Sequence, residues 1–194
     1  MSKQTPPIVM LDTSFLDCLL NKDRPEHHIA SQYFAFWIKN KVLICTSTIC
    51  LAEFAANAEQ LHPIFSTIIQ LPFNAESALL AGDLFRKYKK PVMSEEKSES
   101  VLGRRDALKD DFKIVAAASN AHVNAIAHND SSTMSKFLAC AKEEFEQCHD
   151  LNGILLQDGF DEAKMRNMLG LETELTQTTF FNSLSCDESQ KTCN

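Results

Sequence analysis

Short apolar runs alternate along this chain with segments of helical hydrophobic period. The apolar runs are rich in aliphatic side chains and predict buried strands at residues 8–11, 42–45, 68–71, 124–127 and 151–156. Between them, apolar positions three and four residues apart predict helices at residues 15–20, 27–40, 49–61, 74–90, 112–122, 134–148 and 161–169. Strands that alternate with helices form parallel sheets covered on both faces. The pattern therefore predicts an α/β protein, a three-layer α/β/α sandwich with a central parallel sheet.

The same pattern suggests a division of the chain into two parts. Residues 1–148 carry the regular alternation and are predicted to form one domain. Residues 149–194 are predicted to form a C-terminal extension that is partly helical and ends in a polar tail, where Phe180 and Phe181 are the main apolar pair. Residues 91–103 include the polar run 94–100, which predicts an exposed loop.

Composition narrows the class of protein. With 194 residues and 44% hydrophobic content, the chain can build a sizeable core. No apolar run approaches the roughly 20 residues that span a bilayer, and residues 1–7 are polar, so we expect a soluble protein of the cytoplasm with no membrane contact. The seven cysteines are an odd number and mostly lie in apolar segments, which favours reduced thiols. The net charge of −7 argues against a broad cationic surface.

Four carboxylates stand where strands end or helices begin. Asp12 follows the first strand, where Thr13 or Ser14 can cap the next helix, and Asp130 follows the fourth. Glu53 and Asp111 are expected in the first turns of helices that begin at the same edge of the sheet, which is where open α/β sheets bind ligands. Because clustered carboxylates repel one another, a hard divalent cation such as Mg²⁺ or Mn²⁺ is their natural partner. Such ions can activate water and stabilise the charge that develops on a phosphodiester, which is nuclease chemistry.

The acids belong to four motifs along the chain, which are Leu11-Asp12-Thr13-Ser14, the segment from Ser47 to Glu53, the segment from Asp111 to Ala118, and His128-Asn129-Asp130 leading to Phe137. In this order the motifs resemble those of the PIN-domain nucleases, a family that includes the VapC-type toxins of toxin-antitoxin pairs. The resemblance covers about residues 8–145. It implies that Asp12, Glu53, Asp111 and Asp130 are the catalytic, metal-binding acids. It also implies that Thr13 or Ser14 positions a water or phosphate oxygen and that Arg104 and Arg105 lie near the scissile strand.

Two assignments stay open. His128 stands where the family usually carries Thr, so either Asn129 or Asp130 is the fourth group. Asp110 competes with Asp111, and we favour Asp111 because Asp110 would make a good helix cap.

The predicted function is that of a Mg²⁺- or Mn²⁺-dependent endoribonuclease, with water as the nucleophile and a 5′-phosphate on one product. RNA is the expected substrate, ahead of DNA, and nine basic residues against six acidic ones between Arg86 and Lys113 suit a phosphate backbone. The resemblance further implies the toxin of a toxin-antitoxin or defence system, an antitoxin-like protein partner, and a homodimer formed through the aromatic face of the second helix. The alternative is a non-catalytic PIN-like module that binds RNA or a protein.

Overall fold

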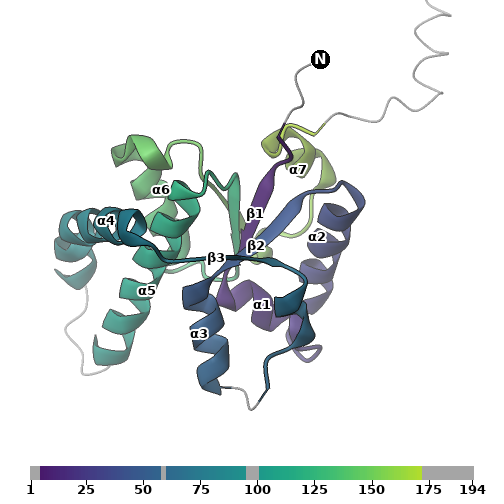
Figure 1. Cartoon of the computed structure of the whole chain (residues 1–194), viewed down its shortest axis with the longest axis horizontal. Coiled ribbons are helices and arrows are strands. Elements are labelled where there is room, and N and C mark those ends of the chain that lie inside the picture. The colour runs from purple at the N-terminus through teal and green to yellow at the C-terminus, as the bar shows by residue number, and fades with distance from the viewer. Residues whose placement is uncertain (1–4, 58–59, 95–100, 172–194) are drawn as a thin grey trace, which may run out of the picture.

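The central layer of the fold is a parallel sheet of five strands. The computed structural model describes residues 5–57, 60–94 and 101–171, with only the backbone described at residues 57, 89–94 and 101–109 (Figure 1). The strands lie in the order β3-β2-β1-β4-β5, and every neighbouring pair is parallel. Their bounds are Ile8–Leu11 for β1, Leu43–Ser47 for β2, Ile69–Leu71 for β3, Ala125–His128 for β4 and Asn152–Leu155 for β5.

Helices cover both faces of this sheet. Figure 1 shows α4, α5 and α6 on one side and α1, α2 and α7 on the other. The α-helices are α1 Thr13–Leu20, α2 His27–Lys39, α3 Thr48–Asn57, α4 Ala75–Ser94, α5 Val101–Asn120, α6 Met134–Glu144 and α7 Glu162–Met168. Short 3₁₀ helices lie at Pro63–Ser66 (η1), Glu146–Cys148 (η2) and Leu156–Asp158 (η3). The predicted three-layer α/β/α fold with a central parallel sheet is therefore confirmed.

The core has two halves, one on each face of the sheet. Met10 of β1 packs into the half formed with α4, α5 and α6, whereas its neighbours Val9 and Leu11 pack into the half formed with α1, α2 and α7. All three side chains are fully buried. Alternate residues of a strand point to opposite faces, and here both faces are covered. That is why the strand is apolar throughout.

The aromatic face of α2 belongs to this core. Trp37 is fully buried between Phe15, with ring centroids 5.5 Å apart, and Tyr33, at 5.6 Å. Phe36 is buried as well and packs on Phe160 at 5.7 Å. The prediction that this face forms a homodimer is wrong, because the chain's own core already covers it. A homodimer itself stays a prediction.

Two helices are longer than the sequence predicted. α4 continues through Pro91 to Ser94, and α5 begins at Val101 rather than at residue 112. The predicted loop at residues 91–103 is therefore wrong at both ends, and residues 95–100 lie outside the described part of the chain. The charged segment before Asp111 is rich in Arg, Lys, Ala and Leu, which are strong helix formers despite their polarity. Asp111 accordingly lies well inside α5 and not in its first turn.

Part of the predicted extension contributes to the same sheet and core. β5 pairs with β4 along its whole length. Met165 of α7 and Leu169 just after it are buried in the half of the core that lies between the sheet and helices α1 and α2. The boundary between a domain at residues 1–148 and an extension at residues 149–194 stays a prediction.

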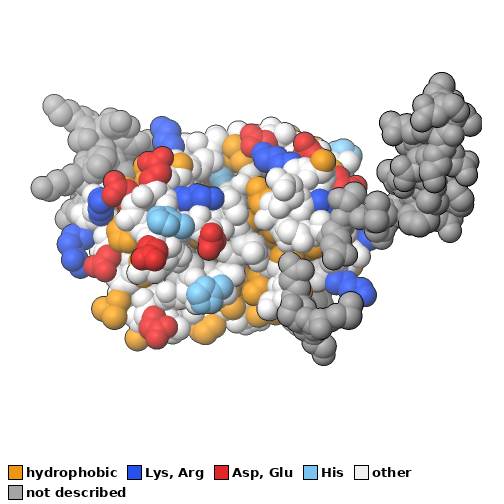
Figure 2. All heavy atoms as spheres, turned by 90° about the horizontal axis from the view of Figure 1, so that it is seen from above, with side chains coloured by type: hydrophobic (Ala, Val, Ile, Leu, Met, Phe, Trp, Pro, Cys, Tyr) orange, Lys and Arg blue, Asp and Glu red, His pale blue; other side chains and the backbone are white. Residues whose placement is uncertain are grey.

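The surface shows no separation of charge on the face viewed in Figure 2, where acidic and basic side chains are interspersed. Among the described helices, none combines the length and apolar character that a membrane crossing requires.

The burial of α4 gives a test of the core. Leu84 is fully buried and Leu79, on the same helix, is 74% exposed. Leu84→Ala should lower the free energy of unfolding by about 2–5 kcal/mol, because it removes buried methyl groups and leaves a cavity. Leu79→Ala should change it by less than about 0.5 kcal/mol. Urea unfolding followed by circular dichroism measures both, and equal effects would contradict this placement of α4.

Candidate functional site

Asp12 lies at the junction between β1 and α1. Its carboxylate Oδ2 accepts hydrogen bonds from the backbone N–H of Ser14 at 3.2 Å and from the Ser14 hydroxyl at 2.6 Å. The prediction that Thr13 or Ser14 caps α1 is wrong, because the helix starts at Thr13 and Asp12 is its N-cap. Asp12 is only 6% exposed. The turn therefore holds one carboxylate in a fixed orientation at the carboxyl end of the central strand.

Glu53 reaches the same region from α3. The hydroxyl of Thr13 donates a hydrogen bond to its Oε2, so Thr13 joins the first helix to the third. Burial raises the pKa of Glu53 above its usual value. The charge of Asp12 adds to this rise in pKa, while the bond from Thr13 opposes it. Asp12 therefore lies close enough to Glu53 to disfavour the ionisation of Glu53.

Asp111 has a carboxyl whose pKa is strongly raised. Burial, with the nearby charges of Asp12 and Asp130, raises its pKa to about 8. Glu53 adds a smaller rise in the pKa, and a hydrogen bond from the Thr133 hydroxyl to Oδ2, at 3.2 Å, opposes it. The charges of all three other predicted acids thus raise the pKa of this one side chain on α5. A carboxyl whose pKa is strongly perturbed by burial and by specific charged neighbours is typical of functional sites.

Asp130 is held by hydrogen bonds at the start of the loop before α6. Its Oδ1 accepts from the backbone N–H groups of Ser132 at 2.7 Å and Thr133 at 3.0 Å, and from the Ser132 hydroxyl at 2.7 Å. Its Oδ2 accepts from the hydroxyl of Thr133. Burial opposes ionisation, but the bonds from Thr133 and Ser132 outweigh it and lower the pKa of Asp130 to about 2. Asp130 is therefore ionised near neutral pH and places a negative charge beside Asp111.

Thr133 was not predicted from the sequence. Its hydroxyl lies within hydrogen-bonding reach of both Asp111 and Asp130, so it links α5 to the end of β4. The signal that could have found it is a hydroxyl residue three positions after a strand-end Asp, where a helix begins.

Asn129, the alternative fourth group, has a different environment. Its backbone N–H donates to the Ser14 hydroxyl at 2.9 Å, and its side-chain Nδ2 lies 3.4 Å from the sulfur of Cys18 in α1. The side chain is thus engaged with α1, whereas Asp130 shares Thr133 with Asp111. His128 is 1% exposed, and burial lowers the pKa of its imidazole below the usual value.

The remaining predicted residues divide into two groups. Asp110 forms an ion pair with Lys113 at 2.6 Å, one turn along α5, so its predicted role as a helix cap is wrong. The side chains of Arg104 and Arg105 lie outside the described residues. The structure thus brings Asp12, Glu53, Asp111 and Asp130 into one electrostatic cluster, and it places the hydroxyls of Thr13, Ser14 and Thr133 among them.

The cluster suits a hard divalent ion by its donor type and charge. Its ligands would be carboxylate oxygens, which Mg²⁺ and Mn²⁺ prefer. The raised pKa of Asp111 reflects charge that a cation would neutralise. Within the described residues, no three Asp, Glu, His or Cys side chains already lie close enough together to bind a common metal ion. Mg²⁺ usually keeps several waters and takes only one or two carboxylates. Asp12 and Asp111 would be the residues to hold it.

Comparison with solved structures supports the fold. One similar structure is a chain in the crystal structure of VapBC2 from Rickettsia felis bound to a DNA fragment from the promoter. The TM-score is 0.50 at 16% sequence identity, and the match covers 75% of this chain and 98% of the other. A chain of FitAcB from Neisseria gonorrhoeae gives a TM-score of 0.48 at 17% identity, covering 77% of this chain and 98% of that one. No protein-family model and no curated protein matches the sequence. The likeness to PIN-domain proteins expected from the motifs is therefore confirmed at the level of the fold.

The raised pKa of Asp111 predicts how stability depends on pH. In the unfolded chain this carboxyl ionises near its ordinary value of 3.8, and in the folded protein only near 8. The folded state therefore binds the extra proton between these values, and its stability falls as the pH rises through about 8. Asp111→Asn should remove this loss and raise the melting temperature at pH 9 relative to wild type, with little change at pH 4.

Thermal unfolding in EDTA at pH 4, 7 and 9 measures this effect. Asp130→Asn is the matched control, because its ionised form is hydrogen-bonded and its pKa is lowered to about 2. That variant should be less stable than wild type at pH 7 and 9. If Asp111→Asn is instead destabilised at pH 9, the carboxylates do not repel one another in the folded protein.

Proposed function

We propose that this protein is a metal-dependent endoribonuclease of the PIN-domain type. The observation that carries the proposal is the electrostatic cluster itself, in which burial together with Asp12 and Asp130 raises the pKa of Asp111 to about 8. Such repulsion does not stabilise the fold, because like charges in a poorly solvated place cost free energy. The PIN-type fold and the four motifs add support, because Asp12 follows the end of β1 and Asp130 follows the end of β4, and open α/β sheets bind ligands at that edge.

The side chains have separate tasks in this proposal. Asp12 and Asp111 hold Mg²⁺ or Mn²⁺, which when bound supplies positive charge for the phosphodiester oxygens. Glu53, kept in place by Thr13, orients the attacking water and accepts its proton. Asp130 fixes the position of Asp111 through Thr133. Arg104 and Arg105 contact the RNA backbone. Water is the nucleophile, so the RNA 2′-hydroxyl is not required. The new P–O bond forms as the P–O3′ bond breaks, and the 3′-oxygen leaves and takes a proton from solvent water, so the other product carries a 5′-phosphate.

We also propose a biological setting for this activity, the toxin of a toxin-antitoxin or defence system. The support is the shared fold with a chain of a complex named VapBC2. An antitoxin-like protein would then be the partner, and the acidic cluster would be the region that it has to block. A homodimer is a further proposal from the same likeness, through a surface other than the aromatic face of α2.

A second candidate is a non-catalytic PIN-like module that binds RNA or a protein. One observation favours it, because no three metal-binding side chains within the described ranges already surround a common point. The two candidate functions differ in whether the acids are needed for catalysis or only for the structure of the binding site.

Cleavage assays with labelled RNA and DNA pools separate the two. We expect RNA cleavage with Mg²⁺ or Mn²⁺, none in EDTA, and a loss of about a hundredfold or more in Asp12→Asn, because a charge-stabilising group is removed. The matched control is Asp17→Asn on the same helix, whose carboxylate pairs with Arg24 at the surface. It should cleave like wild type.

Two results would decide against the enzyme. Cleavage that persists in purified Asp12→Asn would assign the activity to a contaminant or to another site. RNA binding without cleavage, unchanged by EDTA, would support the non-catalytic module.

A further inference from the structure

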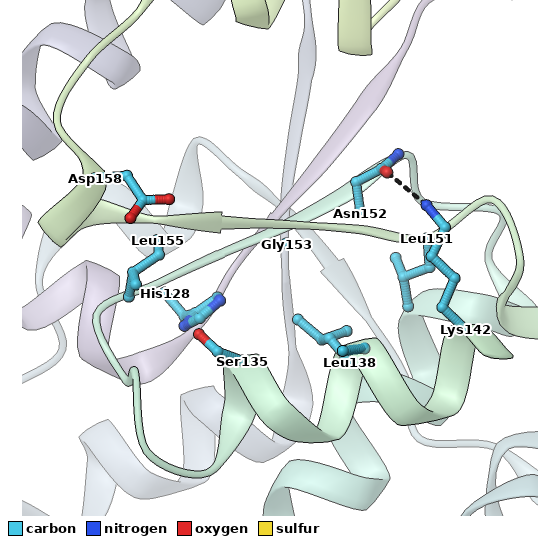
Figure 3. A pocket seen from close by; sticks show the side chains of 10 residues that line it. His128, Ser135, Leu138, Lys142, Leu151, Asn152, Gly153, Leu155 and Asp158 are labelled. Atoms are coloured by element: carbon cyan, nitrogen blue, oxygen red, sulfur yellow. Dashed lines mark hydrogen bonds between the residues drawn. The ribbon is translucent and has the colours of Figure 1, made fainter.

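A cavity of about 260 Å³ lies between β5 and α6, outside the acidic cluster (Figure 3). Ser135, Leu138 and Lys142 line it from α6, and Asn152, Gly153 and Leu155 line it from β5. Ligand pockets usually measure roughly 300–1,000 Å³. This β5–α6 cavity is therefore the size for one small flat ring system and not for a whole nucleotide chain.

His128 contributes a buried polar group to the cavity. Its imidazole points from the end of β4 toward Ser135 and Leu138 in Figure 3 and is 1% exposed. The ring nitrogen Nδ1 has no hydrogen-bond partner among the described residues. Leaving a buried polar atom unpaired costs free energy. The other ring nitrogen, Nε2, lies toward Gly153, so Nε2 is the atom that a ligand in the cavity would meet.

Gly153 keeps the space open. A Cβ atom at this position would lie 3.2 Å from Leu138 Cδ1 and 3.4 Å from His128 Nε2. These distances are tight, so any larger residue on β5 would occupy the cavity and press on the imidazole. Glycine at this position therefore preserves both the hollow and the room beside His128.

One end of the cavity lies at the rim that carries the acids. His128 pairs with Leu155 at the carboxyl ends of β4 and β5, whereas Asn152 lies at the other end of β5. His128 and Ser135 flank the loop that holds Asp130, and the Ser135 hydroxyl donates to the Asp130 carbonyl at 3.1 Å. A group bound beside His128 would thus contact both sides of the loop that positions Asp130.

The lining suits a nucleobase. Leu138 and Leu155 offer apolar contact to the faces of a flat ring, and His128 and Ser135 offer hydrogen-bonding groups to its edge. Asp158, at the rim end next to Leu155 in Figure 3, can only accept hydrogen bonds when ionised. Carboxylates recognise the exocyclic amines of bases. Adenine, cytosine and guanine carry such an amine, and uracil does not.

We propose that the β5–α6 cavity binds one amine-bearing nucleobase of the RNA strand whose phosphate lies at the acidic cluster. The proposal rests on the proposed ribonuclease function for the source of the base. It adds a sequence preference, because single-stranded RNA is read through splayed bases whose edges are hydrogen-bonded by the protein. Uracil is the base that the site rejects.

Binding of CMP and UMP to the full-length protein tests the cavity without requiring catalysis. The two bases differ at C4, which carries an amine in cytosine and a carbonyl in uracil, and at N3, which is an acceptor in cytosine and an N–H donor in uracil. A carboxylate that accepts from the uracil N3–H also meets the two carbonyl oxygens beside it, so it favours the cytosine edge. In EDTA, isothermal titration should give CMP about a tenfold higher affinity than UMP, the factor expected for one net hydrogen bond. Gly153→Ala should abolish this difference by filling the cavity. Gly82→Ala makes the same change where the added Cβ meets nothing within 4 Å, and should keep the difference.

A second pair of variants avoids any effect on folding at Gly153. Asp158→Asn changes an exposed carboxylate, 3.9 Å from Lys164, into a group that can also donate to uracil, so the preference for CMP should fall severalfold. Asp83→Asn, in an exposed pair with Arg86 on α4, is its control and should leave the preference unchanged. Equal affinities of CMP and UMP for the wild type, or an unchanged preference in Asp158→Asn, would overturn the proposal.

Oligonucleotides identify the source of the base. RNA hexamers with C or U at one position should compete with CMP, and those with C should do so better. If CMP binds with the predicted preference but no hexamer competes, the occupant is a free nucleotide and the substrate assignment is overturned. If the protein cleaves RNA but CMP and UMP bind equally, the ribonuclease proposal stands and the base site fails.

Discussion

The repulsion among buried and half-buried carboxylates at one end of the sheet is the constraint on which the rest of the site depends. Asp111 lies near Asp12 and Asp130 in a poorly solvated place, and its pKa rises to about 8 as a result. Asp130 cannot relieve the repulsion by taking a proton, because its hydrogen bonds lower its pKa to about 2. Near neutral pH the cluster therefore needs either a proton on Asp111 or a bound cation.

The fold withstands this repulsion by fixing each acid separately. The backbone N–H of Asp12 donates to the Ala127 carbonyl at 3.0 Å, so the turn after β1 is joined to β4. Ser14 then connects Asp12 to Asn129, and Thr133 connects Asp130 to Asp111. Each hydroxyl spans two elements that are distant in sequence. The parallel sheet supplies the shared edge, and these side chains keep the acids there.

The sequence predicted the strands of the sheet better than it predicted where the helices begin and end. β1 is apolar throughout because both of its faces are covered, and that pattern is readable directly. The start of α5 was missed because a highly charged segment resembles a loop by composition although its residues favour helices. Thr133 and the β5–α6 cavity were missed because both depend on contacts between segments whose packing leaves no periodic signal. The homodimer face was wrong because a helix's aromatic stripe does not say whether core or partner covers it.

The central claim is that these acids form a site for a divalent cation, and a Mn²⁺ titration monitored by electron paramagnetic resonance tests it most directly. At pH 8 the full-length protein should remove free Mn²⁺ from solution in a saturable way, and Asp111→Asn should bind it at least about tenfold more weakly, since one ionised ligand is lost. Lack of saturable binding by the wild type, or equal binding by Asp111→Asn, would contradict the account.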